Sequence, residues 1–307
     1  MKAIRLHQAG GLESLRYEEA PKPSPTDNQV LVRVYAAAIT PTEFAWYPTL
    51  HTPEGGNRPF PIILGHEFSG VVEAIGPTCT GVRNGDPVYG LNDWFMDGAQ
   101  AEYCLTVPAN IAPKPATLDH PLAAAVPISA LTAWQALIER AQLSERQRVL
   151  VHGAAGGVGS FAVQVARYKK AHVIATASAT NTDFVRALGA DEVIDYRTTP
   201  FETVVRDVDV VLDTVGGDTR HRSWEVLKKG GRLVTIAADA EGSNEPRVRD
   251  AFFIVEPNRE QLIDISRLID SGIIRPIVGG VFSMDDVRQA YERKPGRGKN
   301  VLRVAER

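Results

Sequence analysis

The chain has 307 residues, of which 44% are hydrophobic and 23% are charged, and its formal net charge is −3. This length exceeds what one hydrophobic core usually serves, so we expect two domains. The charges form no long run of one sign, which argues against a nucleic-acid-binding protein. The two cysteines, Cys79 and Cys104, are too few for a disulfide framework, and the first residues lack an apolar secretory segment. We therefore expect a cytoplasmic protein.

The first third of the chain is predicted to consist of strands and turns. The β-rich stretches cover residues 2–7, 29–39, 70–76, 81–91 and 98–107. Each is bounded by turn residues such as those of "PKPSPTDN". Prolines then interrupt "PANIAPKPATLD", and we place a domain boundary near residue 118. The sequence therefore predicts a β domain over residues 1–118.

The next segment, from Pro121 to Ile138, carries no charge. A membrane-spanning helix needs about 20 apolar residues. This segment is shorter and contains Pro127, Ser129 and Gln135, among other polar side chains. We expect a buried helix here and no membrane span.

Strands and helices alternate through the middle of the chain. The predicted strands cover residues 148–153, 171–177, 191–196, 208–216 and 230–238, and the predicted helices cover 156–170, 181–190 and 219–229. This spacing is typical of βαβ units around a doubly wound parallel sheet. The tail has a capped helix and a last strand. We expect it to return to the first domain, which gives a central domain of residues 119–271 and a first domain completed by 272–307.

A glycine-rich turn joins the first of these strands to its helix, in "VLVHGAAGGVGSFAVQVA". Gly156, Gly157 and Gly159 permit a tight turn and close approach of the backbone to a ligand, whereas Ala154 stands in place of the usual first glycine. The N–H groups and the dipole at the start of the helix suit a pyrophosphate. The strand before and the helix after the turn supply the context of a dinucleotide-binding site.

The end of the next strand bears on which nicotinamide cofactor binds. An NAD site usually carries Asp or Glu there, but this chain has "IATASATN", whose side chains are small and neutral. Ser178 and its neighbours could hydrogen-bond a 2′-phosphate, and Arg186 or Arg197 could add positive charge. The sequence favours NADP(H) over NAD(H).

Five stretches, "ILGHEFSGVVEAIG", "HGAAGGVGSFAVQVA", "LGADEVIDY", "DTVGG" and "GKNVL", occur in this order over most of the chain. Together they resemble the medium-chain dehydrogenase/reductase superfamily, within it the zinc-independent quinone oxidoreductase branch. The resemblance implies a GroES-like β domain, a Rossmann domain, NADPH between them and a homodimer formed through the Rossmann domains.

The resemblance also implies which residues contact the cofactor. Ala155, Gly156, Gly157 and Val158 would cover the pyrophosphate, and Ser178 and Tyr196 would lie beside the 2′-phosphate. The remaining contacts would come from Thr132, Val215, Gly216, Ala237, Phe253, Val255 and Lys299.

The expected catalytic loop departs from the family pattern. Many quinone oxidoreductases carry Asn where this chain has Thr40, and some carry a Tyr a few residues later. The ungapped match to that Tyr is Ala45, with Trp46 and Tyr47 beside it. We take Thr40 and Tyr47 as the candidate catalytic residues.

His66 and Glu67 resemble half of a zinc site from the zinc-dependent relatives. Catalytic zinc requires three protein ligands and an open position. Thr40 and Ile128 stand where those relatives have cysteines, and Cys79 and Cys104 lie elsewhere. We therefore expect no metal, and we expect His66 and Glu67 to support nearby loops through hydrogen bonds.

These features predict an NADPH-dependent enzyme that transfers hydride to quinones or α,β-unsaturated carbonyls without zinc. We expect an apolar site for the acceptor, with candidate lining residues Phe44, Trp46, Tyr47, Trp94 and Phe95. Two alternatives stay open because fold does not fix function. One is a zinc-type alcohol dehydrogenase, and the other is a non-catalytic NADPH-binding sensor or structural protein.

Overall fold

The computed structural model describes residues 1–305, without the side chain of Ala45. These residues form two compact units. Unit 1 contains Met1–Ile128, Glu256–Gly272 and the segment from Pro276 to the end of the described chain, and unit 2 contains Ser129–Val255 and Ile273–Arg275. The predicted combination of a GroES-like β domain and a Rossmann-type parallel-sheet domain is confirmed.

Unit 1 is built on a seven-stranded sheet with the order β14-β15-β3-β5-β6-β8, in which β7 also pairs with β3. A three-stranded sheet with the order β2-β1-β4 completes the unit. Its strands are β1 (Lys2–Leu6), β2 (Leu15–Glu19), β3 (Val30–Ala38), β4 (Ile62–Ile63), β5 (Glu67–Ile75), β6 (Pro87–Leu91), β7 (Tyr103–Thr106), β8 (Ile111–Pro113), β14 (Val278–Ser283) and β15 (Lys299–Arg303).

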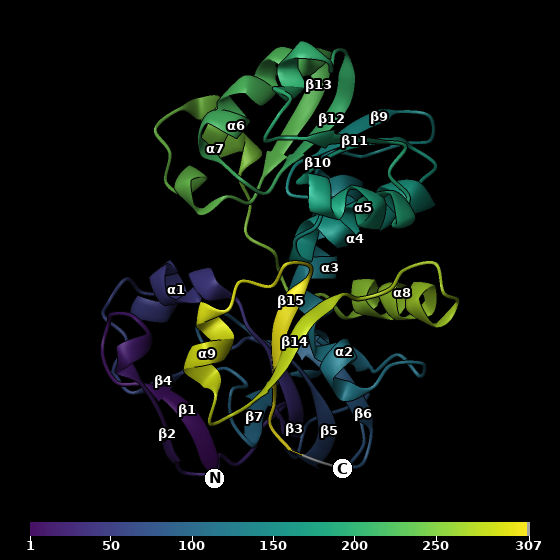
Figure 1. Ribbon diagram of the computed structural model, residues 1–307. Coiled ribbons are helices and arrows are strands. Elements are labelled where there is room, and N and C mark those ends of the chain that lie inside the picture. The colour runs from purple at the N-terminus through teal and green to yellow at the C-terminus, as the bar shows by residue number, and fades with distance from the viewer. Residues whose placement is uncertain (306–307) are drawn as a thin grey trace. The chain divides into compact units, whose positions relative to one another are not determined.

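The predicted return of the tail to the first domain is confirmed. Strand β15 pairs antiparallel with β3, with Val301 opposite Ala38, and β14 pairs parallel with β15. In Figure 1 these two yellow strands lie beside β3, although most of the chain separates them in sequence. The helices of unit 1 are α1 (Tyr47–Leu50), α2 (His120–Ala124), α8 (Arg259–Asp270) and α9 (Val287–Glu292), and α3 (Pro127–Trp134) starts in unit 1 and ends in unit 2.

Unit 2 contains a five-stranded sheet with the order β11-β10-β9-β12-β13, and every pair in it is parallel. Its strands are β9 (Arg148–Val151), β10 (His172–Ala177), β11 (Glu192–Asp195), β12 (Val208–Asp213) and β13 (Leu227–Thr235), and its other helices are α4 (Gly157–Tyr168), α5 (Thr182–Ala187), α6 (Gly217–Ser223) and α7 (Pro246–Ala251). Helices α4 and α5 cover one face, and α6 and α7 lie on the other (Figure 1). The strand order reverses at β9, so ligands are expected at the carboxyl ends of β9 and its neighbours.

The two units do not follow the boundaries that we predicted at residues 118 and 271. Helix α2 packs on β3 and β5 and therefore lies in unit 1. Helix α8, which we did not predict, also belongs to unit 1. The carboxylate of Asp270 accepts hydrogen bonds from the amides of Ala116 (3.1 Å) and Thr117 (3.0 Å), and these bonds tie the end of α8 to the segment after β8.

The short segment Ile273–Arg275 returns to unit 2 because Gln164 binds it at two points. The amide of Arg275 donates to Gln164 Oε1 (2.9 Å), and Gln164 Nε2 donates to the Arg275 carbonyl (3.1 Å). Side-chain amides that are buried normally satisfy both their donor and their acceptor atoms. Gln164 does so here on the main chain of a single distant residue.

The uncharged stretch from Pro121 to Ile138 forms α2, α3 and the start of a π-helical turn (Gln135–Arg140). Most of its side chains are buried, as expected. In the part of the chain that the structure describes, no helix is both long enough and apolar enough to cross a membrane.

Candidate functional site

The glycine turn of unit 2 lies between β9 and α4, and two of its positions require glycine. Gly153 has a φ of +66°, and a Cβ there would meet Thr214 Oγ1 at 2.4 Å. Gly156 is the N-cap of α4 and provides no side-chain cap. A Cβ on Gly159 would lie 2.2 Å from the carbonyl oxygen of Gly153. Gly153, which we did not single out from the sequence, makes the tight turn, and Gly159 allows helix and strand to approach closely.

This turn leaves main-chain amides at the start of α4 that fit a pyrophosphate. The first N–H groups of a helix have no partner within the helix. Because Gly156 caps none of them, Gly157 and Val158 can direct theirs outward. Gly156 itself is exposed, whereas Ala155 and Val158 are half-buried beside it. The helix dipole adds favourable potential for an anion. The structure thus brings Ala155, Gly156, Gly157 and Val158 together, and their arrangement fits the cofactor group that we assigned to them.

Ser178 and Tyr196 lie at the ends of neighbouring strands. Ser178 follows β10, and the amide of Tyr196 donates to the carbonyl of Ala177 (3.3 Å). The hydroxyl of Ser178 is 3.0 Å from Thr180 Oγ1. The guanidinium of Arg197 lies 5.7 Å from the centre of the exposed Tyr196 ring. A hydroxyl cluster, an aromatic ring and a cation are therefore adjacent at this point.

Asp213 organises the loops that follow β12 and β13, and we did not identify it from the sequence. Its Oδ1 accepts hydrogen bonds from the amides of Val215 and Gly216, both at 2.9 Å. Its Oδ2 accepts from Thr235 Oγ1 (2.8 Å), which in turn accepts from the amide of Ala237 (3.2 Å). Asp213 is fully buried. One carboxylate thus fixes three of the predicted cofactor-contact residues.

A carboxylate at the end of an otherwise apolar strand could have revealed Asp213. Strand β12 is buried along its whole length, and Asp213 ends it directly before the turn "TVGG". A buried charge requires several hydrogen-bond partners. In this position the nearest partners are the amides of the following turn.

The other predicted cofactor contacts of unit 2 occupy less exposed positions. Phe253 lies at the carboxyl end of β13, because its amide donates a hydrogen bond to the Thr235 carbonyl (3.4 Å). Its ring centre lies 5.0 Å from the Arg140 guanidinium. Thr132 in α3, Ala237, Phe253 and Val255 are all buried, whereas Val215 is exposed. Of this group, Val215 is the residue whose side chain is directly accessible.

In unit 1, Thr40, Glu67 and Lys299 form a connected polar cluster. Lys299 Nζ forms an ion pair with Glu67 Oε1 and donates a hydrogen bond to Thr40 Oγ1 (3.1 Å). The second carboxylate oxygen of Glu67 accepts from the amide of Ile128 (2.9 Å). Burial raises the pKa of Glu67, and the Lys299 ammonium and the Ile128 amide oppose this rise. The structure therefore brings the candidate catalytic Thr40 together with Lys299, which we had assigned to the cofactor.

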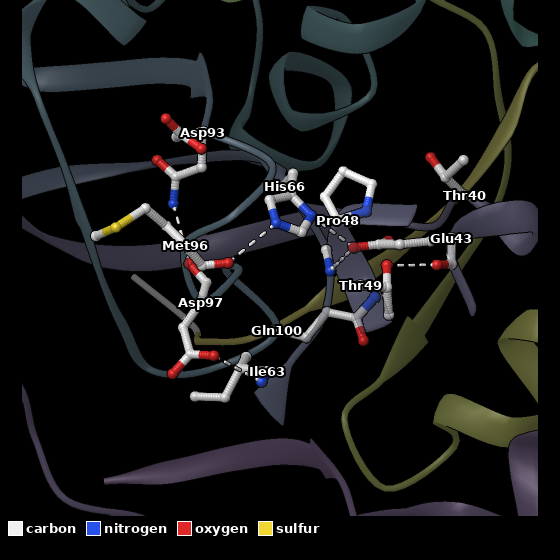
Figure 2. Close-up of polar contacts among 12 residues, drawn as sticks. Thr40, Glu43, Pro48, Thr49, Ile63, His66, Asp93, Met96, Asp97 and Gln100 are labelled. Atoms are coloured by element: carbon white, nitrogen blue, oxygen red, sulfur yellow. Dashed lines mark hydrogen bonds and ion pairs between the residues drawn. The ribbon is translucent and has the colours of Figure 1, made fainter. Parts of the chain in front are cut away.

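His66 is held by Glu43 and does not contact this cluster through a hydrogen bond. Its Nδ1 lies 2.6 Å from Glu43 Oε1, and its Nε2 lies 3.2 Å from the Met96 carbonyl oxygen. Figure 2 shows the ring between these two acceptors. Glu43 Oε1 also accepts from the amide of Gly65 (2.8 Å). The predicted supporting role of His66 and Glu67 is confirmed, because each binds the main chain of another segment.

The residues at the expected zinc position do not suit a zinc ion. Zinc in proteins is bound by thiolate, imidazole and carboxylate groups. Thr40 offers a hydroxyl and Ile128 an aliphatic side chain, and both ring nitrogens of His66 face acceptor oxygens. Within residues 1–305, no group of three or more His, Cys, Asp or Glu side chains is placed to hold a metal ion.

The aromatic residues near Thr40 have separate environments. Tyr47 begins α1, is 45% exposed and stacks on His51 with a ring separation of 4.3 Å. Phe44 lies in a short 3-10 helix (Pro41–Ala45), is partly buried and packs edge-on against Tyr291 beside a core of unit 1. Trp94 contacts both Trp46 and His66.

A parallel sheet with a glycine turn before α4, in one chain with a GroES-like β unit, is an arrangement typical of dinucleotide-binding oxidoreductases. Comparison with known proteins agrees. Residues 26–116 match the family described as "Alcohol dehydrogenase GroES-like domain", and residues 188–302 match the family described as "Zinc-binding dehydrogenase".

Individual relatives match over most of their length. The chain is 30% identical to the NAD(P)H oxidoreductase RTN4IP1, mitochondrial, of Danio rerio, over 91% of this chain and 84% of the relative. It is 33% identical to the 2-methylene-furan-3-one reductase of Solanum lycopersicum, over 95% of this chain and 75% of the relative. The quinone oxidoreductase from Coxiella burnetii has a similar structure, with a TM-score of 0.90, 31% identity and 99% of both chains covered.

The chain belongs to the medium-chain dehydrogenase/reductase superfamily, in its quinone oxidoreductase branch. It is accordingly an NAD(P)H-dependent oxidoreductase, in agreement with the sequence-based expectation at this level.

Proposed function

We propose that this enzyme uses NADPH to reduce quinones or α,β-unsaturated carbonyls without zinc. The observation that carries the proposal is the hydroxyl of Thr40, held by Lys299 where the zinc-dependent relatives have a cysteine. A hydroxyl can donate a hydrogen bond to an oxygen that gains negative charge, which is what reduction of such acceptors requires. The names of the Solanum lycopersicum and Coxiella burnetii relatives, a 2-methylene-furan-3-one reductase and a quinone oxidoreductase, support the same substrate class.

Bound NADPH supplies the hydride. The protein contributes binding and alignment, which raise the effective concentration of the acceptor. The amides of Gly157 and Val158 bind the pyrophosphate, and Ser178 and Tyr196 bind the 2′-phosphate. The hydroxyl of Thr40 donates to the acceptor oxygen, and no residue of the cluster acts as a covalent nucleophile.

NADPH is favoured over NADH because Ser178 and its neighbours present hydroxyl donors to a phosphate. Asp195, which precedes Tyr196 in sequence, accepts a hydrogen bond from the amide of Arg197 (3.1 Å) and so holds the residue whose guanidinium lies over the Tyr196 ring. Hydrogen bonds to a charged group contribute about 1.5–3 kcal/mol each. One such bond gives a preference of about tenfold or more for NADPH. The homodimer and the cytoplasmic location expected from the sequence stay predictions.

A panel of simple quinones, enals and enones tests the proposal, with oxidation of NADPH and of NADH followed by absorbance. We expect at least one acceptor class to be reduced, faster or at lower cofactor concentration with NADPH. The variant Gly156→Asp serves as the control, because Asp is a good helix N-cap but places a carboxylate against the pyrophosphate. If the protein binds NADPH tightly and oxidises none with any acceptor, a sensor function replaces the proposed one.

A further inference from the structure

The Thr40 cluster, which consists of Thr40, Glu67 and Lys299, is formed by three segments that are far apart in sequence. Thr40 follows β3, Glu67 begins β5, and Lys299 begins β15. Strands β5 and β15 both pair with β3, so the three side chains start from adjacent positions in one sheet. The cluster is therefore set by the rigid part of unit 1 and not by a mobile loop.

The cluster has a defined direction of hydrogen bonding. An ammonium group has only donors, so Thr40 Oγ1 must accept from Lys299 Nζ. The proton of the Thr40 hydroxyl then points away from Lys299. Within residues 1–305, no second side chain or amide bonds this hydroxyl, and Thr40 is only half-buried. The hydroxyl thus has one proton ready for a partner outside the protein.

Burial of the ion pair is unusual for a purely structural element. The Lys299 side chain is 10% exposed and that of Glu67 is 0% exposed. Removing two charges from water costs several kcal/mol, and well-packed apolar residues often serve stability equally well. Glu67 is also fixed from its other side by the amide of Ile128. A buried, doubly anchored ammonium that touches a half-buried hydroxyl is better explained by proton supply.

We propose that Lys299 acts through Thr40 as the proton source for the acceptor oxygen, an inference that rests on the proposed function. After hydride reaches the β-carbon of an enone, the carbonyl oxygen carries the negative charge of an enolate. The Thr40 O–H bond breaks and its proton forms a bond to that oxygen, while a proton from Lys299 Nζ moves to Thr40 Oγ1. The enol leaves and becomes the ketone in water, and a quinone is converted to its hydroquinone in the same way.

Each turnover consumes one proton, which comes from water. Lys299 is left as a neutral amine beside the Glu67 carboxylate. Its side chain is 10% exposed, and it regains its proton from water there. Glu67 holds the amine in place. Lys299 is therefore a positioning residue that acts through Thr40, and a contact with the cofactor is not part of this role.

The test compares the wild-type protein with five variants. Thr40→Val removes the hydroxyl and keeps the shape, and Thr40→Ser keeps the hydroxyl. Lys299→Met is combined with Glu67→Gln, so that no unpaired carboxylate is left buried. A triple variant joins Thr40→Val to this pair. Lys294→Met, an exposed lysine near β15, is the control.

The measurements are the single-turnover rate of NADPH oxidation with an acceptor from the panel, its ratio in H2O and D2O, and NADPH affinity by fluorescence titration. General acid catalysis typically contributes about 10²–10⁴-fold, and we expect a loss near 10²-fold in Thr40→Val and in Lys299→Met/Glu67→Gln. Because the two groups act as one unit, the triple variant should be no slower than Thr40→Val. The solvent isotope effect should fall toward one in Thr40→Val, and Thr40→Ser should recover most of the rate that Thr40→Val loses. The NADPH affinity of every variant and the rate of Lys294→Met should stay near those of the wild type.

Three results would overturn the relay. The first is a triple variant in which the rate losses of Thr40→Val and Lys299→Met/Glu67→Gln multiply. The second is a Lys299→Met/Glu67→Gln protein that keeps its full single-turnover rate. The third is a defect of that protein in NADPH affinity. The last result would return Lys299 to the cofactor while the reductase function stands. If the wild type reduces no acceptor at all, the proposed function and the relay fall together.

Discussion

Replacing Asp213 by asparagine should weaken both the fold of unit 2 and its affinity for NADPH. The carboxylate accepts hydrogen bonds from the amides of Val215 and Gly216 and from Thr235 Oγ1. Asparagine keeps the shape and one acceptor oxygen, but it places an NH2 group against one of these donors. The two loops that Asp213 joins would lose their common anchor.

The size of the effect follows from the three bonds. Hydrogen bonds to a charged group contribute about 1.5–3 kcal/mol and neutral ones about 0.5–1.5 kcal/mol. Two amide bonds that become neutral lose about 1 kcal/mol each, and the mismatched bond loses about 1 kcal/mol more. The free energy of unfolding should therefore fall by about 3 kcal/mol, which corresponds to a drop in Tm of roughly 10 °C. Displacement of Gly216 and Ala237 should raise the Kd for NADPH about tenfold.

Thermal unfolding and NADPH fluorescence titration measure the two effects. Asp218→Asn is the matched control, because Asp218 is exposed in the neighbouring helix α6. It should change neither quantity appreciably. The reasoning fails if Asp213→Asn retains the Tm and the Kd of the wild type, or if Asp218→Asn lowers them equally.

Three further predictions concern metal, cofactor choice and pH. Purified protein should contain no stoichiometric zinc by metal analysis, and one zinc per chain that is lost in His66→Ala would contradict this. Ser178→Asp should reverse the preference for NADPH over NADH in paired titrations, because a carboxylate repels a 2′-phosphate; an unchanged ratio of Kd values would count against the assigned site. Burial lowers the pKa of His152 from 6.5 to about 4, so the unfolded chain takes up a proton at a higher pH than the folded one. This contribution, up to about 3 kcal/mol, is present above about pH 6.5 and is lost as the pH falls toward 4. Denaturant titrations at several pH values should show that the free energy of unfolding falls less on acidification in His152→Gln than in the wild type. If it falls equally with pH in the two proteins, His152 is excluded as the cause.

The sequence predicted the parts of the fold that local pattern determines. The alternation of strand and helix in unit 2 and the glycine turn before α4 depend on neighbouring residues, and the structure has both. The boundary between the last predicted helix and strand was wrong, because residues 227–229, predicted as helix, begin β13 (Leu227–Thr235). The mutual position of Ser178 and Tyr196 followed from the resemblance, and the structure gives it a physical basis in the pairing of β10 with β11.

Features that depend on distant partners were not predictable in this way. Helix α8 joins unit 1 through Asp270 and Ala116, which are 154 positions apart. Glu67 meets Lys299 across 232 positions, and nothing near either residue indicates the other. Phe44 looked like an aromatic residue of a loop, but its partner Tyr291 lies at the other end of the chain. The bonds of Asp213 to the amides of Val215 and Gly216 are local and could have been inferred from its place at the end of β12. Its bond to Thr235, which joins the loops after two strands, could not.

The chain passes between the units four times, after Ile128, Val255, Gly272 and Arg275. During synthesis, all of unit 2 is therefore translated before β14 and β15. Until those strands emerge, one edge of β3 is without its final neighbour, and open strand edges invite pairing with other chains. The strands of unit 2, β9 to β13, are continuous in sequence. Unit 2 can therefore form its sheet before unit 1 has received β14 and β15. Loss of β15 alone would consequently leave an edge of β3 unpaired and expose unit 1 to chaperones and proteases.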